Sequence, residues 1–186
     1  MCSNRMTEHA VTFQDQAAGV QAALGITNSH AVPRITHVVL NVGVGKRRDD
    51  KGFMAAVRSD LRAISGQEPH ERRARKAVAG FAVRAGNVVG LRVTLRGKRA
   101  DDFVRRFVGV TLPRVRDFRG LTVSSLDGRG NLSVGVAEQL AFPEINPDKT
   151  DSVFGVQVTF ATTARSDAEG AVLFRALGFP FREAAA

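Results

Sequence analysis

The chain has 186 residues, of which 44% are hydrophobic, and this is enough to bury the core of one domain. Its single cysteine, Cys2, excludes an internal disulfide and a cysteine-based zinc site, and no apolar run approaches the roughly 20 residues that a membrane-spanning helix needs. The opening residues include Glu8 and lack a hydrophobic signal region, so we expect a cytoplasmic protein with no membrane partner.

The formal net charge of +9 is distributed unevenly along the chain. Residues 137–186 have seven acidic and four basic side chains, a net charge of −3, so residues 1–136 have a net charge of +12. A strongly basic segment attracts polyanions, although a basic surface alone also fits a role in solubility or in binding acidic lipid. This separation of basic and acidic residues along the chain favours a nucleic acid as the binding partner.

The N-terminal part of the chain predicts a helix and then a half-buried strand. Apolar residues recur at helical spacing over 13–24, and Gly25 follows as a stop signal. After Pro33 the period changes to two, which is typical of a strand with one buried face. The apolar side of this strand consists of Val38, Leu40, Val42 and Val44, and the polar side includes His37, Asn41 and Gly43.

A second helix and an exposed basic segment are predicted next. Asp49 and Asp50 suit a helix start because acidic side chains stabilise the positive end of its dipole. An apolar stripe then runs over 53–64, and Gly66 ends it. Residues 67–86 are too basic and too rich in glycine for a buried strand, so we expect a strand that runs into a long exposed loop.

The alternation is clearest after Val88. Leu91, Val93 and Leu95 face one way, whereas Arg92, Thr94 and Arg96 face the other. This predicts a strand with one face in the core and one face bearing arginine. A third helix follows Gly97 and is predicted to end at Pro113, with a stripe formed by Phe103, Phe107 and Val110.

The C-terminal part predicts two short strands around the turn at 128–131, a strand over 156–161 and a final helix. Ser166 and Glu169 have the spacing of a capping box, and Gly178 with Pro180 ends the helix. Strands and helices are mixed without strict alternation. We therefore expect a single α+β domain, with an antiparallel-rich sheet, helices packed on one face and a polar face left open.

The segment LPRVRDFRG at 112–120 does not resemble a catalytic site, but its residues suit a loop that binds phosphate groups. Arg114, Arg116 and Arg119 stand between a rigid Pro113 and the terminal Gly120. Guanidinium groups pair bidentately with phosphate and stay charged, so such a loop fits a nucleic-acid backbone. We expect a binding protein rather than an enzyme.

Eight blocks occur in an order that resembles one known family. They are LNVGVG (40–45), ISGQEP (64–69), RARKAVAGF (73–81), VTLRG (93–97), LPRVRDFRGL (112–121), DGRGN (127–131), FPEI (142–145) and ALGFPFR (176–182). The chain is similar to the bacterial large-subunit ribosomal protein number five, the family that binds 5S ribosomal RNA. The resemblance covers residues 32–182, which leaves a divergent helical region at 1–31 and a tail at 183–186.

This resemblance implies a structural ribosomal protein that docks 5S rRNA into the central protuberance. It implies contacts with 23S rRNA, P-site tRNA, neighbouring 5S-associated proteins and, across an intersubunit bridge, a protein of the small-subunit head. In the family, residues matching Asn41, Gln67 and Thr94 contact 5S rRNA. Arg92 and Arg96 would neutralise phosphates beside them, although Asn41 and Thr94 also suit ordinary solvent-facing strand positions.

Two further groups of residues are expected to contact RNA. The loop that approaches tRNA in the family corresponds to Arg72, Arg73, Arg75, Lys76, Phe81 and Arg84. Such a run of cations is usually just a solvated surface, but the neighbouring Gly80 and Phe81 favour the family's tRNA contact. Phe81 itself could stack on a base, although we expect it to fold into the core. An rRNA-binding group is formed by Arg114, Arg116, Arg119 and Arg129, although a tight turn alone explains the glycines beside Arg129.

Two other functions are weighed against the ribosomal one. A nucleotide-binding enzyme is suggested by Gly43, Gly45 and Lys46, but Arg47 and Arg48 stand where a P-loop hydroxyl and a third Rossmann glycine belong. An RNA-binding paralogue or assembly factor that works off the ribosome is supported only by the divergent first helix. The four histidines lack ligand spacing, so we expect no metal and no cofactor.

Overall fold

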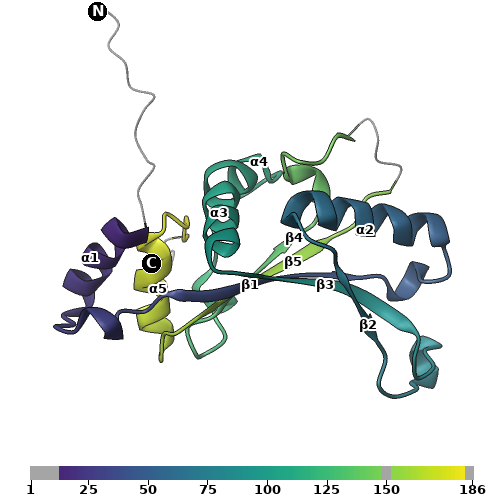
Figure 1. Ribbon diagram of the computed structural model, residues 1–186, viewed down its shortest axis with the longest axis horizontal. Coiled ribbons are helices and arrows are strands. Elements are labelled where there is room, and N and C mark those ends of the chain that lie inside the picture. The colour runs from purple at the N-terminus through teal and green to yellow at the C-terminus, as the bar shows by residue number, and fades with distance from the viewer. Residues whose placement is uncertain (1–12, 148–151, 183–186) are drawn as a thin grey trace, which may run out of the picture.

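Five antiparallel strands form one sheet in the order β2-β3-β1-β5-β4 (Figure 1). The structure is a computed structural model that describes residues 13–147 and 152–182; Cys2 lies outside this range. The strands are β1 (Ile35–Gly43), β2 (His70–Arg73), β3 (Val88–Arg96), β4 (Leu132–Val136) and β5 (Val156–Thr162). These strands and the helices confirm the predicted antiparallel α+β domain.

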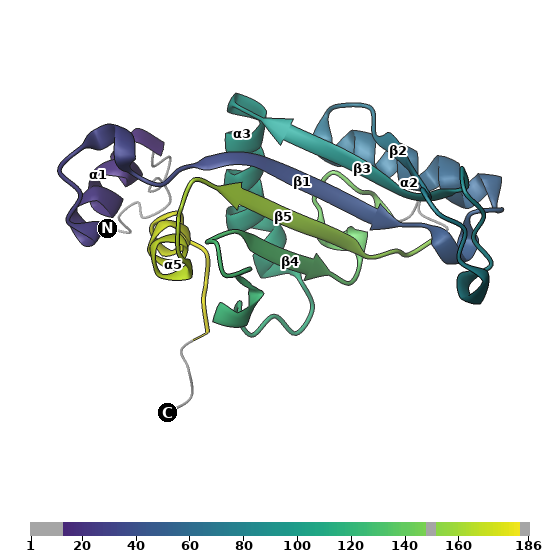
Figure 2. The same ribbon diagram turned by 90° about the horizontal axis from the view of Figure 1, so that it is seen from below.

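Helices cover one face of this sheet and one of its ends. Helices α2 (Lys51–Ser65) and α3 (Lys98–Arg106) lie over the same face, as Figure 1 shows. Helix α1 (Phe13–Leu24) packs against α5 (Asp167–Ala176) beyond the end of β1. Figure 2 looks onto the opposite face of the sheet, with α2 and α3 behind the strands. The helices thus leave this second face of the central strands open.

The core lies between the sheet and α2 and α3. Leu40, Val158 and Phe160 are fully buried on the helix-covered side of the strands. Phe107 stacks on Phe103 with ring centroids 5.7 Å apart and lies 5.4 Å from the ring of Phe160. Burial of these side chains from water is the main stabilising contribution to such a domain.

The predicted helix ends are confirmed by their caps. The Asp50 carboxylate accepts a hydrogen bond from the Phe53 N–H at 3.1 Å, and Gly66 ends α2 in the left-handed conformation at φ +67°. In α5, the Ser166 hydroxyl accepts from the Glu169 N–H, while the Glu169 carboxylate accepts from the Arg165 N–H. The sequence signals at these ends therefore act locally, as capping chemistry requires.

Two expectations were wrong. The helical segment ends at Arg114, within one residue of the predicted end at Pro113, but a π turn (Phe107–Thr111) interrupts it before α4 (Leu112–Arg114). This turn leaves Val110 40% exposed, outside the predicted stripe. The turn at 128–131 is flanked by a strand on one side only, because Leu126 makes just an isolated bridge to Leu132 after a short 3-10 turn (Val123–Ser125).

Candidate nucleic-acid interface

Polar side chains form continuous rows on the face of the sheet that α2 and α3 leave uncovered. The strand register places Arg92, Asn41 and Gln157 side by side, then Thr94, Val39 and Thr159, and then Arg96, His37 and Ala161. His70 extends the first row onto β2, and Ser133 extends the second onto β4. We call this surface the open face. It brings together Asn41, Arg92, Thr94 and Arg96, as the alternation in the sequence predicted.

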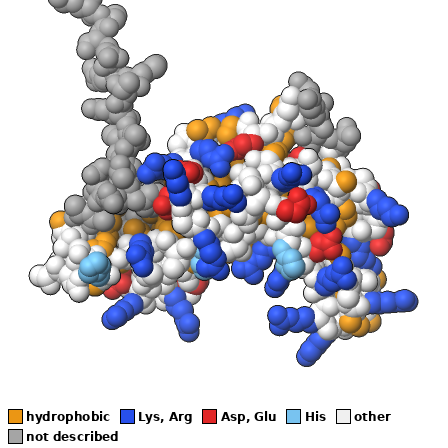
Figure 3. Space-filling view, in the orientation of Figure 1, with side chains coloured by type: hydrophobic (Ala, Val, Ile, Leu, Met, Phe, Trp, Pro, Cys, Tyr) orange, Lys and Arg blue, Asp and Glu red, His pale blue; other side chains and the backbone are white. Residues whose placement is uncertain are grey.

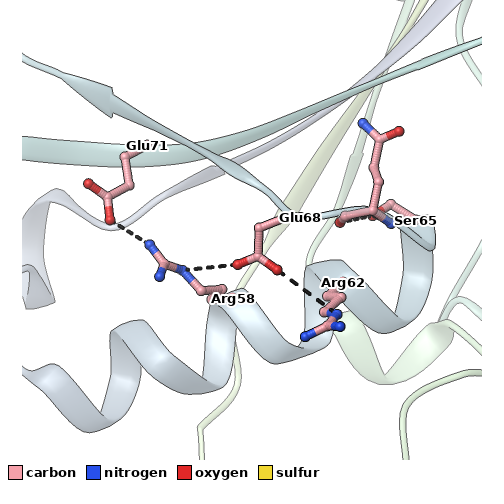
Figure 4. A network of polar contacts seen from close by, with 6 residues as sticks. Arg58, Arg62, Ser65, Glu68 and Glu71 are labelled. Atoms are coloured by element: carbon pink, nitrogen blue, oxygen red, sulfur yellow. Dashed lines mark hydrogen bonds and ion pairs between the residues drawn. The ribbon is translucent and has the colours of Figure 1, made fainter.

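No acidic residue occupies a position on the open face in any of the five described strands. The two faces of β2 differ accordingly: Arg72 shares the open face, whereas Glu71 points to α2 and pairs there with Arg58. On the helix side Glu68 also lies 3.6 Å from Arg58 and 3.9 Å from Arg62, so cations and acids neutralise each other (Figure 4). Basic side chains project below the sheet in Figure 3. The open face is therefore an unbalanced positive surface, the kind that attracts polyanions.

Three residues expected at the 5S contact differ in their local bonding. Among the described residues, neither the Asn41 amide nor the Thr94 hydroxyl has a hydrogen-bond partner, so both can bind a ligand. The Gln67 amide instead donates to the main-chain oxygen of Thr94 at 3.0 Å, and its oxygen lies 3.5 Å from a guanidinium nitrogen of Arg99. Gln67 thus lies at the edge of the open face with its donor already engaged.

The open face also includes polar residues that the sequence reasoning did not select. His37 lies opposite Arg96, and burial, followed by the charges of Arg96 and Arg92, lowers the pKa of its imidazole below the usual range. Gln157 and Thr159 lie across from Asn41 and Val39 on β5. The two-residue alternation that placed Asn41 and Thr94 on the polar faces of their strands also places these three residues there.

The basic loop expected at tRNA is an extension of the β2–β3 hairpin at the far end of the sheet from α1 (Figure 1). Ala74 and Gly86 N–H groups bond across it, Val78 and Val83 form a bridge, and the Arg48 guanidinium donates to the carbonyl of Ala82 at 2.6 Å. Its exposed cations are Arg72, Arg73, Arg75, Lys76 and Arg84. We call residues 72–84 the hairpin tip.

Phe81 is not a core residue, so that expectation was wrong. Its side chain is 78% exposed at the hairpin tip, where a 3-10 turn (Ala79–Phe81) holds the backbone away from the sheet. It borders a hollow of about 530 Å³ with Val44, Val83 and Val89. An exposed aromatic ring beside cations suits stacking on a base.

The loop at 112–120, which we call the arginine loop, lies apart from the open face. It leaves the helix layer at α4, and Arg114, Arg116 and Arg119 are all exposed. Arg114 and Arg116 line a hollow with Glu138, just after β4. The loop is tied to the C-terminal segment, because the Leu121 N–H donates to Pro180 and the Arg182 N–H donates back to Leu121, each at 2.8 Å. These cations form a second basic surface.

Arg129 is exposed on a turn that two aspartates hold. Asp127 accepts from the Arg129 N–H at 2.9 Å and from the Asn131 amide at 2.7 Å, and these donors, the amide first, lower the pKa of its carboxyl. Asp167 accepts from the N–H groups of Gly128 and Gly130 at 3.1 and 2.8 Å. A rigid turn therefore presents Arg129 to solvent next to α5.

The Gly43 to Lys46 segment does not resemble a phosphate-binding loop. A 3-10 turn (Gly45–Arg47) separates β1 from α2, and the Asp50 carboxylate already caps the α2 N-terminus where a phosphate would bind. Among residues 13–147 and 152–182, no group of three or more His, Cys, Asp or Glu side chains could hold a metal ion. Within the same residues, no helix is both long and apolar enough to cross a bilayer.

Comparisons with known proteins give a consistent result. Residues 28–84 match the family described as ribosomal protein L5, and residues 88–181 match the model of the C-terminus of that ribosomal family. The large ribosomal subunit protein uL5 of Hamiltonella defensa is 51% identical over 152 residues, which cover 82% of this chain and 85% of that protein. The uL5 of Rubrobacter xylanophilus is 48% identical over 169 residues, covering 91% and 94% of the two chains.

Proposed function

The chain belongs to the ribosomal protein L5 family, and on that premise we propose that it binds 5S rRNA through the open face of its sheet. Family membership makes it a structural constituent of the large ribosomal subunit that takes part in translation, and not an enzyme. Large-subunit proteins of bacteria such as these relatives work in the cytoplasm.

The observation that supports the open face most strongly is its charge. Arg92 and Arg96 have no acidic neighbour on that face of the described strands, whereas Arg58 and Arg62 on the helix side are paired with acids. Arginine side chains neutralise phosphates, while the Asn41 amide and the Thr94 hydroxyl can reach 2′-hydroxyl groups and base edges. A broad, shallow polar sheet fits the minor groove of an RNA helix better than it fits a small ligand.

The other basic surfaces complete the proposed set of partners. The hairpin tip contacts P-site tRNA through Arg72, Arg73, Arg75, Lys76, Phe81 and Arg84. The arginine loop and Arg129 bind 23S rRNA, beside neighbouring 5S-associated proteins and a bridge to the small-subunit head. In support, apart from Arg72, which also lies on the open face of β2, the cations of the hairpin tip and of the arginine loop lie beyond the open face, so one chain can engage several partners at once.

A binding comparison tests the central proposal. The full chain is titrated with 5S rRNA in the presence of an unrelated structured RNA of the same length, and we expect it to prefer 5S rRNA. Replacing Arg92 and Arg96 with Gln should weaken this binding by at least tenfold, since two phosphate contacts are lost.

The matched control removes the same charge from the other face. Lys51 and Arg62 are exposed on α2, and replacing both with Gln should leave most of the 5S rRNA affinity intact. Equal losses in the two double variants would mean that net charge, and not the open face, determines binding.

A further inference from the structure

Three nitrogen-bearing side chains lie within three consecutive rows of the open face. His37 of β1 lies directly opposite Arg96 of β3, and Arg92 lies four residues before Arg96 on the same side of β3. The imidazole Nδ1 of His37 and the guanidinium Nε of Arg92 are shielded from solvent, and neither has a hydrogen-bond partner among the described residues. Buried polar atoms are normally paired, so two unpaired nitrogens on the same face indicate a place where an acceptor binds.

The charge of the surroundings defines the kind of acceptor. On β3 Arg96 lies opposite His37 and Arg92, two rows away, also acts on it by charge; on β5 Ala161 lies opposite it and Thr159 is in the next row, and both are uncharged. Guanidinium groups bind a phosphate oxygen pair with fixed geometry, and an imidazole N–H adds one more donor. An anion with several oxygens, such as the phosphodiester of an RNA backbone, fits this set of donors.

We propose that His37, Arg92 and Arg96 form one phosphate site, and that RNA binding at this site is coupled to protonation of His37. The inference rests on the proposed function, because it concerns the same open face. It assigns His37 a direct role in binding and makes the affinity for RNA depend on pH.

The sign of the pH dependence follows from the neighbours of His37. In the free protein, burial and the two arginines keep the pKa of the imidazole low, so His37 is neutral at pH 7. A bound phosphate offsets the positive charge of the two arginines and raises that pKa, so that the complex takes up a proton. Affinity therefore increases as the pH falls through the pKa of the complex toward the pKa of the free protein, and it is constant at higher pH.

Binding of 5S rRNA to the full chain at pH 7.5 and at pH 6.0 measures this coupling. The wild-type protein should gain about three- to tenfold in affinity at the lower pH, because one proton contributes at most tenfold per pH unit. His37→Gln keeps a neutral donor and should lose most of the gain. His37→Lys has a fixed charge, so it should bind at least as tightly as wild type at pH 7.5 and show little pH dependence.

His30→Gln is the control, since His30 lies in a short turn (Ser29–Ala31) outside the sheet, and it should behave like wild type. Calorimetry of the wild-type protein in two buffers of different ionisation enthalpy at pH 6.5 needs no variant and should detect net proton uptake on binding. An unchanged pH dependence in His37→Gln, or no proton uptake by the wild type, would overturn the inference while leaving 5S rRNA binding intact. Failure to bind 5S rRNA at any pH would instead defeat the proposed function itself.

Discussion

The amide of Gln67 donates a hydrogen bond to the main-chain oxygen of Thr94 at 3.0 Å, although 27 positions separate the two residues. Strand β2 pairs with β3 only as far as Arg92, so this carbonyl lies beyond the end of the partner strand. Gln67 replaces the missing strand contact with its side chain. We infer that it maintains the edge of the open face, while the Thr94 hydroxyl remains available for RNA.

Gln67→Ala should therefore act mainly on stability. The substitution removes one partly buried hydrogen bond, which is worth about 0.5–1.5 kcal/mol. Urea denaturation of the free protein measures this loss. A variant that is as stable as wild type but binds 5S rRNA poorly would show that the amide contacts RNA directly.

Asn41→Ala and Thr94→Ala should act on binding. Neither side chain has a hydrogen-bond partner among the described residues, so their loss should leave the unfolding free energy almost unchanged. Each should weaken 5S rRNA binding by about 1 kcal/mol, or about fivefold, because a neutral contact is lost. If both variants bind like wild type in a filter or calorimetric titration, the open face is not the contact surface.

The salt dependence of binding should distinguish charged from neutral contacts. Each phosphate that an arginine neutralises adds about 0.7–0.9 to the magnitude of the log–log salt slope, by analogy with DNA and single strands. Arg96→Gln should reduce the slope by about this amount, whereas Asn41→Ala should preserve it. Titrations at several salt concentrations give both slopes, and a flat wild-type titration would contradict the phosphate contacts.

The hairpin tip should be separable from the open face. Replacing Arg72, Arg73, Arg75 and Lys76 with Ser should keep the fold and, because only Arg72 of these four also belongs to the open face, most of the 5S rRNA affinity, yet increase the rate of P-site tRNA dissociation. The effect should grow at raised salt, where the remaining contacts are screened. Dissociation from ribosomes assembled with each variant, at matched salt, is the measurement.

The control for the hairpin variants uses equal charge changes. Ribosomes in which Arg75 and Lys76 are replaced by Ser should release tRNA faster than ribosomes in which Lys51 and Arg62 are replaced by Ser. The reason is that only the first pair lies at the hairpin tip. Equal rates would remove the proposed role of the tip. Loss of 5S rRNA binding in the fourfold variant would assign these cations to the 5S contact instead.

Gly170→Ala should destabilise the turn that presents Arg129. A methyl group at Gly170 would lie 2.7 Å from the Cα of Gly130, backbone against backbone, so either α5 or the turn must move. We expect a loss of about 1–3 kcal/mol in urea denaturation. Gly135→Ala on β4 meets open space and should change stability by much less.

The alternation in the sequence was sufficient to predict β1, β3 and β5 and the two faces of the sheet at these strands. Leu91, Val93 and Leu95 are buried as expected, and Arg92 and Thr94 lie on the other side, because a period of two translates directly into opposite faces. The helix N-caps at Asp50 and Ser166 could also be predicted from the sequence.

Features that depend on tertiary context were not predictable. Val110 lies outside the apolar stripe because it belongs to a π turn (Phe107–Thr111), and no local residue pattern indicated that turn. Phe81 is exposed because hydrogen bonds across the hairpin fix the tip away from the core, whereas composition alone favoured burial. To predict the hydrogen bond from the Gln67 amide to the Thr94 main-chain oxygen, one would have to know where β2 ends.

Ultraviolet crosslinking of intact large subunits that contain this chain tests the central claim most directly, with both the RNA and the attached peptide identified. The account predicts 5S rRNA joined mainly to peptides that contain open-face residues of β1 and β3, such as Asn41 and Arg92. Attachment of 5S rRNA only to peptides of α2 or α3, or the absence of 5S rRNA among the crosslinked RNAs, would contradict it.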